Sequence, residues 1–198
     1  MKTKDKPVIR PVYFFYGVED YLIDEEIQKL LDQILSQKER GLNLHVFSGE
    51  EHRSQDIIQA AQTLPMFSQY RVVLVSETDR MDEEKIEALL KYMPAPSPTT
   101  CLILYGETLG LWKKHRAAIE EVGVMKEYSR LKGKSLISWM RNRMLERGKK
   151  LTEDAADYLV EVVGDHLHDL ENALEKAFLI VGKKQTIELS DAEGIASE

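Results

Sequence analysis

The sequence predicts an α/β domain with a parallel sheet and flanking helices, followed by a small all-helical domain. Two observations carry this prediction. In the first two thirds of the 198-residue chain, short apolar runs of strand length alternate with segments whose apolar residues recur at helical spacing. After residue 129 only helical patterns continue. Strands that alternate with helices pair in parallel, because parallel neighbours need crossover connections.

Five apolar runs are the predicted strands: VYFFYG (12–17), LNLHVF (42–47), RVVLVS (71–76), CLILYG (101–106) and VMKEY (124–128). The third and fourth runs are apolar almost throughout, which is typical of central strands covered on both faces. Helices are expected between the strands, over residues 20–38, 53–62 and 82–93, where apolar residues fall on one face.

The predicted boundary lies near RLKGKS (130–135), which gives domains 1–130 and 131–198. Three helices are expected in the second domain. Thr152 is a predicted N-cap, and glycines mark the predicted helix ends at Gly148, Gly164 and Gly182.

The last residues predict the start of one more helix. Ser190 and Glu193 have the spacing of a capping box. The sequence stops at Glu198, before such a helix could bury a face, so we expect a longer natural chain; a frayed terminus is the alternative.

Composition excludes several classes of protein. A net charge of −7 argues against binding nucleic acid by bulk attraction, so any contact with DNA must come from a local patch. The single cysteine, Cys101, excludes an internal disulfide and fits a reducing cytoplasm. No run approaches the ~20 apolar residues of a membrane span. We expect a cytoplasmic protein without a membrane partner.

The stretch YFFYGVEDYLIDEEI (13–27) has the strand, glycine and helix of a phosphate-binding loop. A working loop of the form G-x-x-x-x-G-K-[ST] needs a second glycine, a lysine for the phosphates and a hydroxyl for magnesium. Counted from Gly17, those positions hold Leu22, Ile23 and Asp24. The sequence therefore predicts a degenerate nucleotide site. Glu77, after RVVLVS, could be read as a magnesium ligand, although a surface carboxylate is the commoner case.

No arrangement of residues predicts catalysis, a metal or a cofactor. His166 and His168 are two residues apart, so a helix points them to different faces, which makes them poor metal ligands. His45 lies within an apolar strand and is expected to be structural.

Two stretches have the composition of contact surfaces. In the first, Leu64, Met66 and Phe67 flank Pro65 in a predicted loop, where they could enter a pocket of a partner or fold back over the domain's own core. The second, residues 130–150, has eight Lys or Arg and one acid. Its possible DNA-facing residues are Arg141, Arg143 and Arg147; a solvated helix face is the alternative.

Taken in order, these segments resemble the delta subunit of the bacterial DNA polymerase III clamp loader. The resemblance covers YFFYGVEDYLIDEEI, TLPMFSQYRVVLV and the helical run from residue 131 to 180. Within that run it includes Gly164, Asp165, Asn172, Leu174, Glu175 and Lys176.

The resemblance implies an AAA+ fold with a degenerate nucleotide site, a helical lid and no ATP hydrolysis of its own. It implies that Met66 and Phe67, with Leu64 beside them, bind and help open the sliding clamp (beta subunit). Other expected partners are the ATPase subunits, delta prime and, in the assembled complex, DNA. Met66 departs from the family's usual leucine, and His168 stands where the family often has an arginine. The family's C-terminal collar domain has no counterpart in this sequence. A divergent P-loop-like ATPase or kinase is the alternative.

Overall fold

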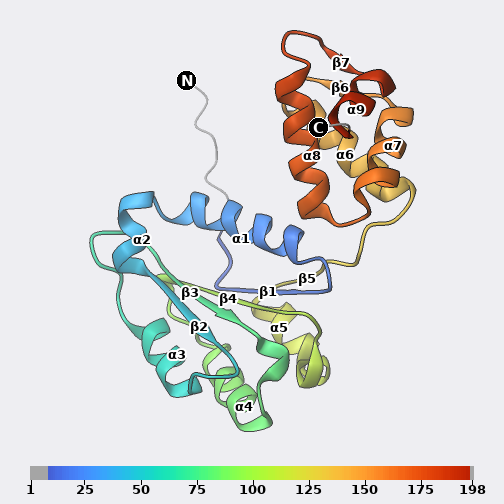
Figure 1. The fold of residues 1–198 in the computed structure, drawn as a ribbon. Coiled ribbons are helices and arrows are strands. Elements are labelled where there is room, and N and C mark those ends of the chain that lie inside the picture. Colours follow the sequence, from blue (N-terminus) through green and yellow to red (C-terminus); the bar gives the residue numbers. More distant parts are fainter. Residues whose placement is uncertain (1–8, 197–198) are drawn as a thin grey trace. The chain divides into compact units, whose positions relative to one another are not determined.

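A computed structural model describes residues 9–196, and the chain divides into two compact units after Ser129. Figure 1 shows the helices and strands of each unit.

The first unit contains a five-stranded parallel sheet with strand order β2-β3-β4-β1-β5. In chain order the strands are β1 (Val12–Tyr16), β2 (Leu44–Ser48), β3 (Arg71–Ser76), β4 (Thr100–Gly106) and β5 (Gly123–Glu127). All four pairings between neighbours are parallel. The predicted α/β fold with a parallel sheet is confirmed.

Helices connect the strands and cover both faces of the sheet. They are α1 (Asp20–Ile34), α2 (Gln37–Asn43), α3 (Ser54–Gln62), α4 (Glu83–Tyr92) and α5 (Arg116–Val122), with 3₁₀ helices η1 (Thr78–Arg80) and η2 (Gly110–His115). The single helix expected over 20–38 is wrong at its end. The backbone is extended at Leu35, and α2 begins after Ser36 in a capping box with Glu39. Because α2 runs to Asn43, β2 begins later than expected.

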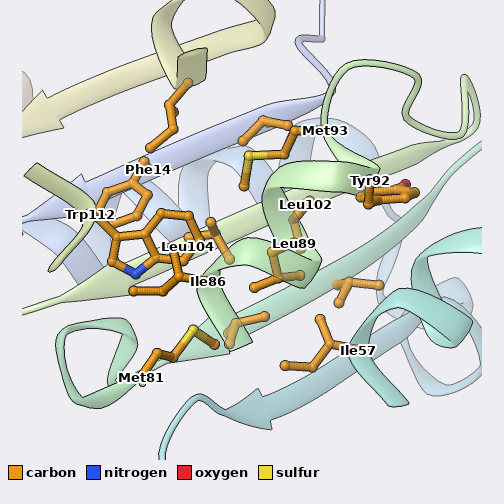
Figure 2. Packing of buried hydrophobic residues seen from close by; sticks show 14 of the residues in the cluster. Phe14, Ile57, Met81, Ile86, Leu89, Tyr92, Met93, Leu102, Leu104 and Trp112 are labelled. Carbon is orange, nitrogen blue, oxygen red and sulfur yellow. The ribbon is translucent and has the colours of Figure 1, made fainter. Parts of the chain in front are cut away.

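Alternate residues of the central strands enter two separate apolar cores. On one face, residues such as Phe14, Val73 and Leu104 pack against α3, α4, α5 and the fully buried Trp112 of η2 (Figure 2). On the other face, Phe15 and Ile103 pack against α1. This alternation explains why these strands read as continuous apolar runs: each is covered on both sides.

The second unit is a helical bundle with one small strand pair. Its elements are α6 (Lys134–Glu146), β6 (Lys150–Leu151), α7 (Glu153–Val163), α8 (Leu167–Ile180), β7 (Thr186–Ile187) and α9 (Leu189–Ala196). The three expected helices are confirmed, and the Thr152 hydroxyl accepts a hydrogen bond from the Ala155 N–H as the predicted N-cap. The parallel pairing of β6 with β7 was not expected, because two-residue strands have no readable period.

The expected capping box at the last helix is wrong. Ser190 lies inside α9, and the Asp191 carboxylate accepts a hydrogen bond from the N–H of Glu188, the residue before the helix (2.8 Å). The expectation that this helix buries nothing is also wrong, since Ala192 is fully buried and α9 contacts α7 and α8.

Candidate functional site

The junction between β1 and α1 depends on Gly17 for close packing. Gly17 has φ +136°, and an added Cβ would lie 2.1 Å from the carbonyl oxygen of Tyr128. No L-residue side chain fits there. The glycine that suggested a phosphate loop is therefore required by the chain that follows β5, whether or not a phosphate binds.

The same junction is too short, and too fully hydrogen-bonded, to cradle phosphates. Two residues, Val18 and Glu19, separate Gly17 from the start of α1. The Gly17 N–H donates to the Gly106 carbonyl and the Glu19 N–H to the Tyr128 carbonyl, both at 3.2 Å. A phosphate cradle needs backbone N–H groups that point at the anion. Two of those groups already bind protein carbonyls here.

The three positions that would complete a phosphate loop lie inside α1. Ile23 is 3% exposed and belongs to the core between the sheet and α1, and Leu22 packs against the same cluster. Asp24 lies at the wall of an adjoining cavity of about 400 Å³. The side chains at these positions provide neither a cation nor a hydroxyl.

The charged residues that line that cavity are five acids, Asp20, Asp24, Glu77, Asp79 and Glu107, and one cation, Arg80. Arg80 already pairs with Glu50 (2.7 Å) and with Glu77. Glu77, the possible magnesium ligand, has a left-handed backbone (φ +53°) and accepts a hydrogen bond from the Ser48 hydroxyl (2.6 Å). The lining repels anions. Across residues 9–196, no group of three or more His, Cys, Asp or Glu is arranged to hold a metal ion.

The loop between α3 and β3 presents large apolar side chains to solvent. Leu64 is 71% exposed, Met66 49% and Phe67 92%. The alternative that these residues fold back over the core is wrong for Phe67, whose ring has almost no protein neighbour. Phe67 also has a left-handed backbone, φ +54°, which is rare and strained for an aromatic residue.

The backbone of this loop is held by the side chain of Asn43, at the end of α2. The Asn43 Oδ1 accepts a hydrogen bond from the Met66 N–H (2.7 Å), and its Nδ2 donates to the Met66 carbonyl (2.9 Å). The Nδ2 also donates to the Glu39 carbonyl (3.1 Å), which fixes the amide itself. Asn43 is fully buried.

Arg71, the first residue of β3, provides a second anchor. Its guanidinium is buried and donates to the Leu64 carbonyl (3.1 Å), while its other terminal nitrogen contacts the His45 ring. Burial, and then the charge of Arg71, lower the pKa of His45. A neutral His45 can accept from the guanidinium at neutral pH. The sequence predicted a structural role for His45, and in the structure His45 supports the loop through Arg71.

Two arginines at the C-terminal end of α6 take part in the packing of the second unit. Arg143 Nε donates to the Glu171 carboxylate (2.8 Å), and Arg147 also binds Glu171, which is itself mostly buried. Arg141 is more exposed, and its closest acidic partner, Glu153, lies at 3.9 Å. Of the three candidates, Arg141 presents the most solvent-accessible charge.

Comparison with known proteins places the chain in a family. The family profile described as "DNA polymerase III, delta subunit" matches residues 13–123, more than half of the chain. The chain belongs to the DNA polymerase III delta subunit family. The matched segment includes both the degenerate junction at Gly17 and the exposed loop of Leu64, Met66 and Phe67.

Relatives in the delta family agree with this result. The chain is 30% identical to the DNA polymerase III subunit delta of Bacillus subtilis, over 97% of this chain and 58% of that protein. It is also similar to a solved structure of the Bacillus subtilis DNA clamp loader delta protein, with a TM-score of 0.78 and 28% identity over 94% of this chain. The chain therefore spans somewhat more than half the length of these relatives.

A more distant likeness concerns the fold alone. The RuvB branch migration motor of Thermotoga maritima matches 96% of this chain and 62% of its own, with a TM-score of 0.53 and 16% identity. The predicted AAA+-like architecture of this delta-family chain is thus confirmed.

Sequence reasoning missed the residues that support the exposed loop. Asn43 lies in a segment predicted as strand, and Arg71 reads only as the polar start of RVVLVS. One signal was present: a buried Asn and a buried Arg need hydrogen-bond partners, and a neighbouring loop without regular structure has backbone groups to offer.

No helix among the described residues is long and apolar enough to cross a membrane.

Proposed function

We propose that this chain is a non-catalytic clamp-loader subunit that binds the DNA sliding clamp and helps to open it during replication. The observation that carries the proposal is the loop of Leu64, Met66 and Phe67. It offers Phe67, an aromatic residue that is 92% exposed and directly follows backbone held at Leu64 by Arg71 and at Met66 by Asn43. An exposed aromatic on a fixed backbone suits insertion into an apolar pocket, since little ordering opposes it.

The junction at Gly17 supports the non-catalytic part of this proposal. The short, hydrogen-bonded junction and the acidic cavity beside it are poorly suited to bind a nucleoside triphosphate. The alternative, a divergent P-loop-like ATPase or kinase, would need a cation at this junction. Arg80, the cation of the cavity lining, is already paired with Glu50 and Glu77.

The remaining parts of the proposal concern the assembly. We assign the first unit to the clamp-binding AAA+-like domain and the second to the helical lid. The proposed partners are the sliding clamp (beta subunit), the ATPase subunits, delta prime and, in the assembled complex, DNA. The chain would act in the cytoplasm within the DNA polymerase III holoenzyme, whose polymerase is the nucleotidyltransferase.

Substitution of Phe67 tests the clamp-binding function. Truncation of a buried hot-spot aromatic typically costs about 2–4 kcal/mol, or roughly 30- to 1,000-fold in affinity. We expect Phe67→Ala to nearly abolish binding to the cognate clamp in surface plasmon resonance, and Met66→Ala to weaken it less. Leu111→Ala is the matched control, because Leu111 is an exposed apolar residue (48%) of η2, outside this loop.

The binding measurements on the loop variants and the Leu111→Ala control have three distinguishable outcomes. Loss of binding by Phe67→Ala with normal binding by Leu111→Ala supports the proposal. Wild-type affinity of a Met66→Ala, Phe67→Ala double variant would end the clamp-binding assignment of this loop. Equal losses in the loop variants and the control would point to a nonspecific apolar contact and also contradict it.

A contact with DNA is proposed for Arg141 alone of the three arginines, because Arg143 and Arg147 bind Glu171. Charge reversal in Arg141→Glu should weaken DNA-dependent clamp loading and flatten its dependence on salt. If the salt dependence of clamp loading by the assembled loader is unchanged in this variant, Arg141 belongs to a solvated helix face and does not contact DNA.

A further inference from the structure

We infer that Asn43 and Arg71 are positioning residues that hold the loop of Leu64, Met66 and Phe67 in its clamp-binding conformation before the clamp arrives. The inference rests on the proposed function, since it concerns how the same loop reaches a partner. Neither side chain would touch the clamp, because both are buried in the first unit.

The Asn43 side chain acts toward Met66 as a neighbouring strand would. It satisfies both the N–H and the carbonyl of one residue, at 2.7 and 2.9 Å. The two bonds hold the peptide groups on both sides of Met66 and so fix the orientation of this residue as well as its position, which a single hydrogen bond does not. The third bond, to the Glu39 carbonyl, prevents the amide from following the loop if the loop moves.

The anchors fall on alternate residues of the loop. Arg71 holds the carbonyl of Leu64, and Asn43 holds both backbone groups of Met66. Phe67 directly follows this held residue and is exposed to solvent. The left-handed backbone of Phe67 therefore starts from a peptide group that Asn43 fixes, and such a conformation persists when the surrounding structure determines it.

The consequence is a lower ordering cost at the moment of binding. A loop that fluctuates must lose backbone freedom when its side chains enter a pocket, and each residue that must be ordered reduces affinity by roughly tenfold. With Met66 and Leu64 held in advance, that cost falls on folding instead. Release of the anchor should therefore weaken binding without removing any contact with the clamp.

The test uses the whole chain with Asn43→Ala, and Asn43→Asp as a variant that keeps the acceptor for the Met66 N–H but turns a second acceptor on the carbonyls of Met66 and Glu39. Trp112→Phe is the matched control. It also removes a buried hydrogen bond, from the indole N–H to the Thr78 carbonyl (3.0 Å), but beyond the opposite ends of the strands. Clamp affinity by surface plasmon resonance, melting temperature and hydrogen exchange of the Met66 amide are measured for each.

We expect Asn43→Ala to weaken clamp binding about tenfold and to speed exchange of the Met66 amide, and Asn43→Asp to do so at least as strongly, because its buried carboxylate repels the two carbonyls. Trp112→Phe should melt earlier yet bind normally. In a Met66→Ala background the effect of Asn43→Ala should shrink, because the two act through one residue. Arg71→Met should change binding in the same direction as Asn43→Ala.

Two results would overturn the inference while the proposed function stands. One is wild-type clamp affinity in Asn43→Ala when Phe67→Ala has lost it. The other is strict additivity of Asn43→Ala and Met66→Ala. If Phe67→Ala itself binds normally, the clamp function fails, and exchange of the Met66 amide alone then decides whether Asn43 holds the loop: unchanged exchange rejects the positioning role.

Discussion

At the scale of single residues, Phe67 combines two features that ordinarily cost stability: an exposed apolar ring and a left-handed backbone. Contacts within the unit do not offset either cost, because Phe67 is 92% exposed. Strain of this kind persists when the surrounding structure determines it, and it concentrates at functional positions. Because Phe67 follows the anchored Met66 in an exposed loop, its position is typical of a residue that binds a partner.

This strain makes a prediction for stability that is separate from binding. Phe67→Gly should raise the free energy of unfolding above that of Phe67→Ala by about 1 kcal/mol, because glycine adopts positive φ without penalty. Chemical denaturation measures both. Gly148→Ala is the reciprocal control: φ is +77° and an added Cβ meets no atom within 4 Å, so its expected loss of about 1 kcal/mol reports backbone strain alone. A Phe67→Gly variant less stable than Phe67→Ala would contradict the strain.

The sequence could predict the apolar residues of the loop but not the residues that hold them. Leu64, Met66 and Phe67 stand out because large apolar side chains around a proline fit neither the strand nor the helix period. The pairing of Asn43 with Met66 joins residues 23 positions apart, and nothing in the local pattern of either segment encodes it. Which buried polar group meets which backbone is decided by tertiary packing.

At the scale of elements, strands were predicted well where burial is complete and helix ends less well. β3 and β4 are covered on both faces, so their apolar runs have no competing interpretation. The break between α1 and α2 was missed although Ser36 and Glu39 carry the capping-box spacing, because apolar periodicity alone continues through it. α5 is seven residues long, too short for a clear period.

The β1–α1 junction gives the prediction at this scale. Gly17→Ala would place a methyl group 2.1 Å from the Tyr128 carbonyl oxygen and should destabilise the first unit by about 2 kcal/mol or more. Gly41→Ala in α2 has open space and should stabilise by about 0.5–1 kcal/mol, since alanine is the better helix former. Thermal denaturation of both variants checks this. Equal effects would mean that Gly17 is not held by packing.

At the scale of the whole molecule, the chain divides into two compact units after Ser129, and the sequence shows a change of period near residue 130. The two-sided sheet core of the first unit could also be inferred from continuous apolar strands. The burial of Lys149 could not: its ammonium donates to the carbonyls of Gly182 and Lys184 (both 2.7 Å), a contact within the second unit between residues far apart in sequence.

Cys101 offers a chemical measure of how the first unit opens. It is the single cysteine of the sequence, lies on β4 and is fully buried between the sheet and α1. Burial raises the pKa of its thiol to about 12 from 9.0, so the thiolate required for alkylation does not form in the folded unit near pH 8. Labelling at that pH must follow exposure of β4, one of the central strands.

We therefore expect alkylation of Cys101 at pH 8 to be slower in the native chain than in denaturant by on the order of a thousandfold or more, the factor set by a typical unfolding free energy.

The raised pKa of Cys101 also fixes the sign of a pH dependence of stability. The contribution of this thiol to the free energy of unfolding is complete below about pH 9 and is lost as pH rises toward 12. Cys101→Ala should lack that part of the decline, which a comparison of the two chains by denaturation from pH 8 to pH 11 isolates. Rapid native labelling would mean that β4 opens without unfolding the sheet, and identical pH profiles for the two chains would mean that folding does not raise the pKa of this thiol.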